Sequence, residues 1–170
     1  MLLGFIWNQR MKRWDFMEVR PATSEDESFL YELYANTRLE EVTNWGWDER
    51  TIDGFLRMQW MAQRQSYQLQ YPNLRQQLVL VQAQQAGRVL TCAAERALIL
   101  VDISLLPEYR GQGIGTKLIQ AVQQEAAERR QSVQLSVLHD NPAAKRLYER
   151  LGFKVTGDSD TRCQMEWHKE

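Results

Sequence analysis

Three observations predict that this sequence forms one domain of mixed α and β structure. Its 170 residues are 44% hydrophobic and 10% aromatic, which suits a single compact domain with a sizeable core. Short strand-like segments and helical patterns follow one another from residue 17 onward. A nearly continuous apolar run, Ala97 to Leu106, leads through a glycine-rich turn into a helical pattern. We therefore expect an α/β (α+β) fold in a single domain over residues 17–170.

Residues 1–16 precede the first pattern of a folded domain. Met1 to Ile6 is apolar, but this run is too short for a membrane span, and no basic region precedes it and no small-residue cleavage site follows it. Met11 and Met17 are both alternative starts. We expect residues 1–16 to be a loosely ordered extension without a targeting signal or a membrane segment.

One strand and two helices are expected in the first part of the domain. Pro21 ends the strand, and Thr23 supplies a hydroxyl cap before an acidic first helical turn. Tyr71 and Pro72 end the second helix. The expected elements are a strand at 17–20, a helix from about 24 to 36–38, a polar and aromatic connection at 39–48, and a helix from 49 to about 69.

The middle of the chain reads as a hairpin followed by a central strand. Two strands, 77–83 and 88–94, flank Gln84-Gln85-Ala86-Gly87, which we interpret as the hairpin turn. Ala97 to Leu106 is apolar along nearly its whole length, as in a strand that is covered on both faces. We expect it to be the central strand of the sheet.

The last third alternates helices and strands. Asn141 is a capping residue and Pro142 occupies the first helical position, while Gly152 ends that helix. Its Leu147 and Leu151 form a core stripe, whereas Tyr148 lies on a second face that is free to meet a ligand. The expected elements are a helix at 114–129, a strand at 132–138, a helix from 142, and strands at 153–155 and 161–167.

The turn Arg110-Gly111-Gln112-Gly113-Ile114-Gly115-Thr116 has the character of a phosphate-binding loop. Main-chain amides at a helix start lack partners within the helix and lie at the positive end of its dipole, and glycines let an anion approach them. The P-loop pattern fails because Thr116 and Lys117 stand in the wrong order and spacing. The dinucleotide fingerprint fails because its third glycine would fall on Ile114 or Leu118.

Arg-x-x-Gly-x-Gly, formed by Arg110, Gly113 and Gly115, resembles the acetyl-CoA pyrophosphate loop of the GCN5-related N-acetyltransferase (GNAT) family. The resemblance covers residues 17–168 in the order of the elements, and its most specific parts are 101–115 and 141–153. It implies the GNAT fold, a central mixed and mostly antiparallel sheet of about six or seven strands flanked by about four helices.

The resemblance also implies that acetyl-CoA is the cosubstrate and lies where the central strand separates from the strand at 132–138. The main chain of Ile103 and Leu105 would pair with the pantetheine, and Asn141 would contact it. Main-chain amides of the glycine turn would hold the pyrophosphate, with Arg110 shaping the loop and adding charge. The residues expected to bind the cosubstrate are Ile103, Leu105, Arg110, Gly111, Gln112, Gly113, Ile114, Gly115, Thr116 and Asn141.

Tyr148 matches the tyrosine that points at the CoA sulfur in many GNAT enzymes. A phenol has a reference pKa of about 10, so it stays protonated at neutral pH and can protonate a departing thiolate. The glutamate of histone-acetylating members is replaced here by Ile99, which cannot accept a proton. Asp102 is expected to face the other side of the strand and to have a structural role. Two routes for the proton of the amine stay open: a water-relayed base from the connection after the first helix, or an amine that arrives partly neutral.

The connection between the first two helices borders the acceptor site in the family. Its carboxylates and aromatic rings suit a cationic amine through ion pairs and cation–π contacts. Packing of the tryptophans into the core is the competing interpretation. The residues expected to meet the acceptor are Glu40, Glu41, Trp45, Trp47 and Asp48, of which Glu40, Glu41 and Asp48 are the candidates for a base.

Composition excludes several other functions. A net charge of −1 with interspersed signs provides no broad basic face for nucleic acid. Cys92 and Cys163 are far apart and lack metal-ligand spacing, which predicts no metal site and suits a reducing cytoplasm. We expect a cytoplasmic acetyl-CoA-dependent N-acetyltransferase in which a primary amine of a small molecule or peptide attacks directly, with Tyr148 as general acid. A non-catalytic acyl-CoA-binding regulatory module is the alternative, and a homodimer stays open.

Overall fold

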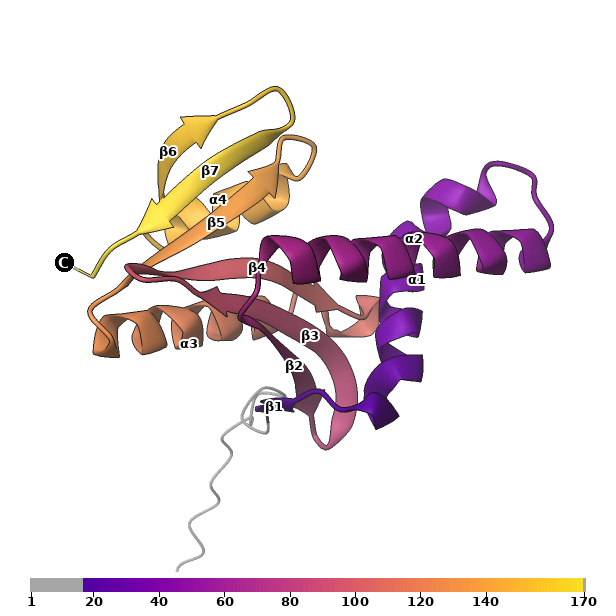
Figure 1. Ribbon diagram of the computed structural model, residues 1–170, viewed down its shortest axis with the longest axis horizontal. Helices are drawn as coiled ribbons and strands as arrows, with labels where there is room; N and C mark the ends of the chain where they lie inside the picture. The colour runs from indigo at the N-terminus through magenta and orange to yellow at the C-terminus, as the bar shows by residue number, and fades with distance from the viewer. Residues whose placement is uncertain (1–16, 170) are drawn as a thin grey trace, which may run out of the picture.

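The computed structural model describes residues 17–169, and this part of the chain forms a seven-stranded sheet with four α-helices (Figure 1). The predicted extension at residues 1–16 lies outside the described residues. The elements are β1 (Met17–Pro21), η2 (Ser24–Asp26), α1 (Glu27–Thr43), α2 (Glu49–Gln70), β2 (Leu74–Val81), β3 (Gln84–Ala93), β4 (Ala97–Leu105), η3 (Pro107–Tyr109), α3 (Ile114–Glu128), β5 (Ser132–Leu138), α4 (Pro142–Arg150), β6 (Lys154–Asp158) and β7 (Arg162–Trp167).

The strand order is β1-β2-β3-β4-β5-β7-β6, which puts β4 in the centre. All neighbouring strands are antiparallel except β4 and β5, which are parallel. The predicted central strand and the mixed, mostly antiparallel sheet are thus confirmed.

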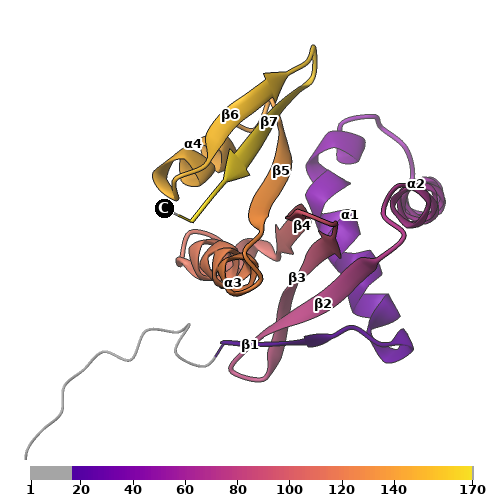
Figure 2. The same cartoon turned by 60° about the vertical axis from the view of Figure 1, so that its left-hand side comes forward.

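β4 and β5 pair only over their first halves. Ala97 to Leu100 pair with Ser132 to Leu135, and the remainder of β5 pairs with β7 on its other side. Figure 2 shows β5, β7 and β6 leaning away from the β1–β4 part of the sheet. Ala97, Leu98 and Leu100 are buried, whereas the residues from 101 to 105 are only half-buried. The expected cover on both faces therefore holds for the first half of β4 only.

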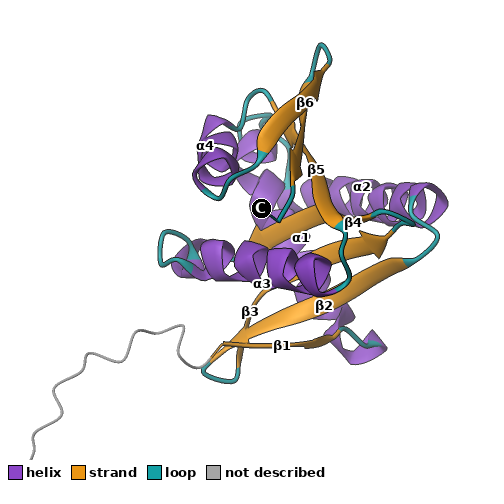
Figure 3. Cartoon of the chain, turned by 90° about the vertical axis from the view of Figure 1, so that its left-hand side faces the viewer, coloured by secondary structure: helices purple, strands orange, loops and turns teal. Residues whose placement is uncertain are grey.

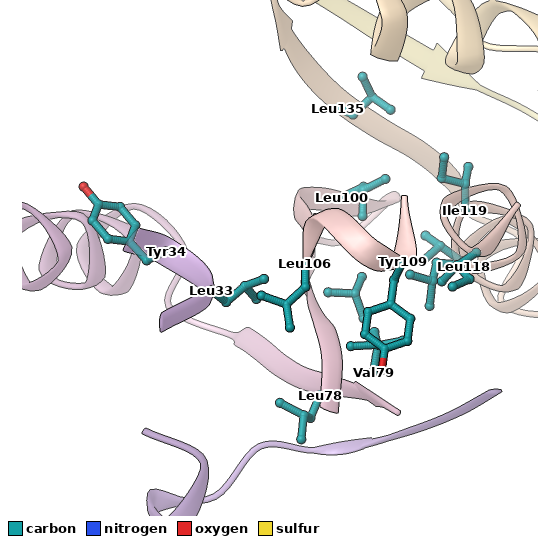
Figure 4. Packing of buried hydrophobic residues seen from close by; sticks show 14 of the residues in the cluster. Leu33, Tyr34, Leu78, Val79, Leu100, Leu106, Tyr109, Leu118, Ile119 and Leu135 are labelled. Carbon is teal, nitrogen blue, oxygen red and sulfur yellow. The ribbon is translucent and has the colours of Figure 1, made fainter. Parts of the chain in front are cut away.

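Helices lie on both sides of the β1–β4 part. α1 with α2 packed against it lies on one side and α3 on the other (Figures 2 and 3). Figure 4 shows Leu33 of α1 and Leu106, which follows β4, pointing toward one another, and Tyr109 beside Leu118 of α3. All four side chains are buried. This packing fixes the end of β4 and the start of α3, the two elements on either side of the glycine turn.

The first helix is longer than predicted. It was expected to end near 36–38, but α1 continues to Thr43, so the connection to α2 shrinks to residues 44–48. Val42 is only 1% exposed, and burying it in the core favours the extra helical turn. The hydroxyl of Thr43 also donates to the carbonyl of Leu39 at 2.7 Å. Glu40 and Glu41 consequently lie on the helix and not in a loop.

The hairpin turn also differs from the prediction. Gln84 to Gly87 were expected to form the turn, but they lie inside β3, and the turn consists of Gln82 and Ala83. Both have positive φ, 52° and 62°, which is the conformation of a two-residue type I′ turn. Gln82 and Ala83 are not the Asn-Gly or Asp-Gly residues that usually form such turns, so the sequence did not indicate a turn at this position.

The structure also shows the state of the two cysteines, the grouping of potential metal ligands and the character of the helices among the described residues. Cys92 and Cys163 are both free and buried. No group of three or more His, Cys, Asp or Glu side chains within 17–169 is arranged to hold a metal ion. None of the helices in this range has the length and apolar character needed to cross a membrane.

Candidate functional site

A cleft of about 490 Å³ opens where β4 and β5 separate. One wall comes from the second half of β5 and from α4, and the other comes from α1 and α2. Three residues predicted for the site, Ile103, Asn141 and Tyr148, line it together. The lining residues are Tyr34, Thr37, Arg38, Gln63, Tyr67, Arg88, Leu100, Val101, Asp102, Ile103, Ser104, Leu135, Ser136, Val137, Leu138, Asn141, Ala144, Tyr148 and Arg162.

The open edge of β4 offers main-chain groups to this cleft. The amide of Leu106 donates to the carbonyl of Ala86 on the β3 side at 2.9 Å. Because successive residues of a strand direct their main-chain groups to alternate edges, those of Leu105 and Ile103 are directed to the β5 side. The carbonyl of Leu105 already accepts from Nε of Arg110 at 2.9 Å, so a ligand that pairs there would use its amide. An extended ligand can thus pair with β4 without displacing a strand.

Tyr148 lies on α4, whose start is fixed by the cap predicted from sequence. The Asn141 side chain accepts from the amide of Ala144 at 3.1 Å, and Pro142 occupies the first helical position. The Tyr148 ring packs edge-on against Phe153 at 5.6 Å between centroids, and Phe153 is only 2% exposed. Burial, reinforced by the charge of Asp102, raises the pKa of Tyr148 to about 12. The phenol is therefore a proton donor throughout the physiological range.

Asp102 lies in the cleft, contrary to the expected position on the opposite side of β4 from Ile99. A β-bulge explains the difference, because Leu90 pairs with Asp102 while Thr91 pairs with Leu100. The extra residue, Val101, shifts the alternation by one. Asp102 then shares a face with Ile99, since their partners on β3 are two residues apart.

Hydrogen bonds hold the Asp102 carboxylate in place. Its Oδ2 accepts from Nε of Arg88 at 3.1 Å and from the hydroxyl of Ser104 at 2.7 Å. Arg88 is only 5% exposed and also reaches Oε1 of Gln63 on α2 at 3.4 Å. The expected structural role of Asp102 thus coexists with a place in the cleft wall.

The glycine turn forms a separate part of the site at the start of α3. Gly111 and Gly113 have φ of +68° and +84°, a region that favours glycine. Gly113 is the N-cap of α3 and makes no side-chain hydrogen bond to the helix, so the amides of the first turn face outward without a capping side chain. A Cβ added at Gly115 would meet nothing within 4 Å. These features fit an anion such as a pyrophosphate.

Two side-chain contacts brace this turn from outside. Arg110 is bound to the Leu105 carbonyl, and the side-chain amide of Gln112 donates to the carbonyl of Glu108. Ile114 is buried at 1% exposure, so its contribution to a ligand is confined to its main chain. The turn is thereby tied to the end of β4.

The predicted acceptor residues do not line the cleft. Trp45 and Trp47 form an aromatic cluster with Phe55, with ring centroids 5.0 to 5.6 Å apart, and the two tryptophans are 42% and 44% exposed. Asp48 caps α2, and its hydrogen bonds from the hydroxyl and amide of Thr51 lower the pKa of its carboxyl. Glu40 is exposed, and Glu41 lies in a smaller hollow of about 130 Å³ beside the cleft.

Sequence reasoning missed several charged and polar side chains that line the cleft. Arg38, Tyr67, Arg88 and Arg162 come from four different elements, and only Arg88 gave a signal, as the one charged residue of its strand β3. Burial raises the pKa of Tyr67, with Asp102 adding to the shift while Arg88 and Arg162 oppose it. These three charged side chains therefore all act on the Tyr67 hydroxyl.

A larger hollow of about 870 Å³ lies at the other end of β5. Residues of the α3–β5 connection and the end of β7 line it, and none of the predicted site residues is among them. The smaller cleft, with Tyr148 and the open edge of β4, is the better candidate for the reaction site.

Comparisons with known proteins show which proteins the chain is similar to. Residues 75–155 match the model of the Acetyltransferase (GNAT) domain, a range that runs from β2 to β6 and includes both the glycine turn and Tyr148. Thialysine N-epsilon-acetyltransferase of Bos taurus is 47% identical over 74 residues, which cover 43% of this chain and 41% of that protein. Spermine/spermidine N(1)-acetyltransferase of Bacillus subtilis is 39% identical over 64 residues, which cover 36% and 42%. The chain thus spans about two fifths of the length of these curated relatives.

Similarity to solved structures extends over a greater part of the chain than sequence similarity to the curated relatives does. The PaiA N-acetyltransferase of Thermoplasma acidophilum, solved in complex with coenzyme A, superposes with a TM-score of 0.69 and covers 90% of this chain and 99% of its own. Its sequence identity is 18%, so this likeness concerns the fold. The predicted resemblance and fold class are confirmed.

Proposed function

Since the chain belongs to the GNAT acetyltransferase family, we propose that it transfers the acetyl group of acetyl-CoA to a primary amine. The observation that carries the proposal is the opening between β4 and β5, with Tyr148 in its wall and an anion-binding turn at the start of α3. The amine attacks the thioester while both substrates are bound, so no acyl-enzyme forms.

Acetyl-CoA is held by two separate parts of the chain. The pantetheine pairs with the main chain of Ile103 and with the amide of Leu105, and the Asn141 side chain contacts it. The pyrophosphate occupies the turn, bound by amides from Gln112 to Thr116, with Gly111 and Gly115 leaving room and Arg110 adding charge. The fit of acetyl-CoA to these residues rests on the main-chain groups of β4 that face the cleft and on the empty space beside Gly115.

In the reaction, the amine nitrogen bonds to the carbonyl carbon and the C–S bond breaks. Tyr148 donates its phenolic proton to the departing thiolate, and the surplus proton of the nitrogen returns to the pool that reprotonates Tyr148. The products are an N-acetyl amine and free CoA. The raised pKa of Tyr148 ensures that the phenol carries its proton when the thiolate leaves.

Of the two routes for the amine proton, arrival of a partly neutral amine has the better support. Asp48 is bound to Thr51, and Glu40 and Glu41 lie outside the lining of the cleft. Among the described residues that line the cleft, Asp102 is the one with a carboxylate. In this proposal it holds the acceptor amine in position.

The acceptor is an amine of a small molecule or a peptide. The curated relatives support this class, because their names include a spermine/spermidine N(1)-acetyltransferase and an N-alpha-acetyltransferase. The protein acts in the cytoplasm, without nucleic acid or membrane as a partner and without a metal, and a homodimer stays open.

A non-catalytic acyl-CoA-binding module is the alternative, and Tyr148 argues against it because a pure binder needs no acid beside the sulfur. The test is thiol release from acetyl-CoA by the purified protein with a panel of amines, alongside Tyr148→Phe and Gly113→Asp. The acetyltransferase proposal is supported if turnover falls in Tyr148→Phe and if both turnover and CoA binding are lost in Gly113→Asp. CoA binding without turnover on any amine supports the module, and no CoA binding refutes both.

A further inference from the structure

The acceptor end of the cleft has more positive than negative charge. Arg38 from α1, Arg88 from β3 and Arg162 from β7 line it, whereas Asp102 is the carboxylate among the lining residues. The three arginines come from three separate elements of the chain and line the same cleft. A bound molecule in this space therefore meets an excess of positive charge.

The arginines differ in how far their charge is already compensated. Arg88 is buried and bound to Asp102 at 3.1 Å, so these two charges offset each other. Arg162 donates to Oγ and to the main-chain oxygen of Ser136 at 2.8 and 2.9 Å, which fixes its guanidinium on neutral acceptors. Arg38 meets Glu41 only at 3.4 Å, with both side chains at least half exposed. Arg162 and Arg38 thus hold positive charge that is available to a ligand.

This distribution disfavours a simple di- or polyamine. A second ammonium group of such a substrate would lie among the arginines, where like charges repel one another. An acceptor with one reacting amine and one anionic group finds a partner for each group in the cleft. Asp102 can meet the ammonium, and the guanidinium fork of an arginine can bind a carboxylate or a phosphate.

Building on the proposed function, we infer that the acceptor is an amine that also carries an anionic group, with Asp102 at the ammonium and Arg162 and Arg38 at the anion. This narrows the acceptor to molecules such as amino acids, carboxylate-bearing peptides or phosphorylated amines. Carboxylate and phosphate bind arginine by the same chemistry, and matched amines that carry one or the other distinguish them.

The test compares matched amines that differ only in the anion. Binding of lysine against cadaverine, and of phosphoethanolamine against ethanolamine, is measured by titration calorimetry on the full chain saturated with CoA. We expect the anionic member of at least one pair to bind ten times more tightly or better, and the pair that responds identifies carboxylate or phosphate. Arg162→Gln and Arg38→Gln should each reduce that ratio at least threefold while CoA affinity is unchanged.

Arg57→Gln is the matched control, because Arg57 is an exposed arginine of α2 that pairs with Asp53 and lies outside the cleft lining. It should leave the ratio as it is. The inference is overturned if both anion-free amines bind as tightly as their anionic partners or more tightly. It is also overturned if the affinity ratio within a pair is unchanged in Arg162→Gln and Arg38→Gln, or if none of the four compounds binds. Thiol release with the same compounds tests the proposed function separately: an anion preference without thiol release refutes catalysis alone, and faster acetylation of cadaverine than of lysine refutes the inference alone.

Discussion

Leu100 of β4 and Leu135 of β5 form the last pair of residues before these two central strands separate. The bulge residue Val101 follows Leu100 directly. A bulge increases the local twist of a strand, so the remainder of β4 turns away at the position where β5 goes on to pair with β7 alone. The cleft is therefore a consequence of one inserted residue, which also moves Asp102 to the cleft face.

The first prediction concerns Tyr148. Replacing it by Phe should reduce kcat about 100-fold, the usual scale for loss of a general acid, with no change in the affinity for acetyl-CoA. In the unmodified protein the pKa of Tyr148 is raised to about 12, so the phenol stays protonated below that pH and the rate should not fall from its ionisation up to about pH 10. Stopped-flow thiol release against pH measures both effects. A falling limb near pH 9 that is absent from the Phe variant would contradict the assignment.

The second prediction separates stability from binding at Gly115. It occupies the second position of α3, and an added Cβ would meet nothing within 4 Å, so Gly115→Ala should raise the free energy of unfolding by roughly 0.5 kcal/mol. The same methyl group occupies space assigned to the pyrophosphate, so the Kd for CoA should increase about tenfold. Urea unfolding and calorimetry measure the two quantities.

Gly54→Ala is the control for this experiment. Gly54 is an exposed helical glycine of α2 whose added Cβ also meets nothing. It should stabilise the fold by a similar amount and leave CoA affinity as it was. An unchanged Kd in Gly115→Ala means that the phosphate does not approach this side of the turn.

The third prediction concerns Glu40 and Glu41. The double change to Gln should leave kcat/KM at neutral pH within about twofold, because both side chains lie outside the cleft lining. A tenfold fall with a shifted pH profile would restore the water-relayed base. Steady-state rates between pH 6 and 9, with the unfolding midpoint as a check on the fold, decide between the two routes.

The sequence was a good guide where local pattern determines structure. The apolar run at β4, the Asn141-Pro142 helix start and the glycine turn all carry their signal within a few residues, and each lies where it was predicted. The end of α1 was wrong because the burial of Val42 depends on elements that pack against it from elsewhere in the chain. The bulge at Val101 was invisible because Val101 simply continues the apolar run from Ala97 and no local pattern marks a bulge there.

The end of the cleft where the acceptor is proposed to bind depends even more on tertiary structure. Arg88, Asp102 and Gln63 meet from three elements, and their hydrogen bonds could not be read from spacing along the chain. Trp45 and Trp47 were expected to meet the acceptor because their connection borders the acceptor site in the family and aromatic rings suit a cationic amine. In the fold they cluster with Phe55 of α2 outside the cleft lining, and at 42% and 44% exposure they are not packed into the core as the competing interpretation held.

The fourth prediction uses the unusual hairpin turn. Ala83 has a φ of 62°, where a side chain is strained, so Ala83→Gly should stabilise the protein by about 0.5 kcal/mol after the entropy of the added glycine is subtracted. Ala94→Gly is the control, because Ala94 is an exposed loop residue that is not among the residues with positive φ. It should destabilise the protein by about 0.5 kcal/mol. Equal losses in both variants, measured by urea unfolding, would show that the turn is not strained.

The fifth prediction concerns Asp26, which is 2% exposed and joins β1, η2 and β3. Its carboxylate accepts from both terminal nitrogens of Arg20 at 2.8 Å, from the amide of Thr23 at 2.9 Å and from Gln85 at 3.1 Å. The hydrogen bonds from Arg20, followed by that from Thr23, hold the pKa of this carboxyl well below its usual range. Asp26→Asn should therefore cost about 2 kcal/mol of unfolding free energy at pH 7.

The pH dependence follows from the sign of that shift. A carboxyl whose pKa is lowered by folding contributes its full stability above the unfolded pKa of about 3.9, and this contribution declines as the pH falls below that value. The difference in unfolding free energy between the parent and Asp26→Asn should therefore be constant from pH 7 to 5 and shrink between about pH 4 and 2. Glu25→Gln, at the exposed neighbouring position, should give no such difference. A gap that stays constant down to pH 2 would mean that the loss comes from packing and not from the charge.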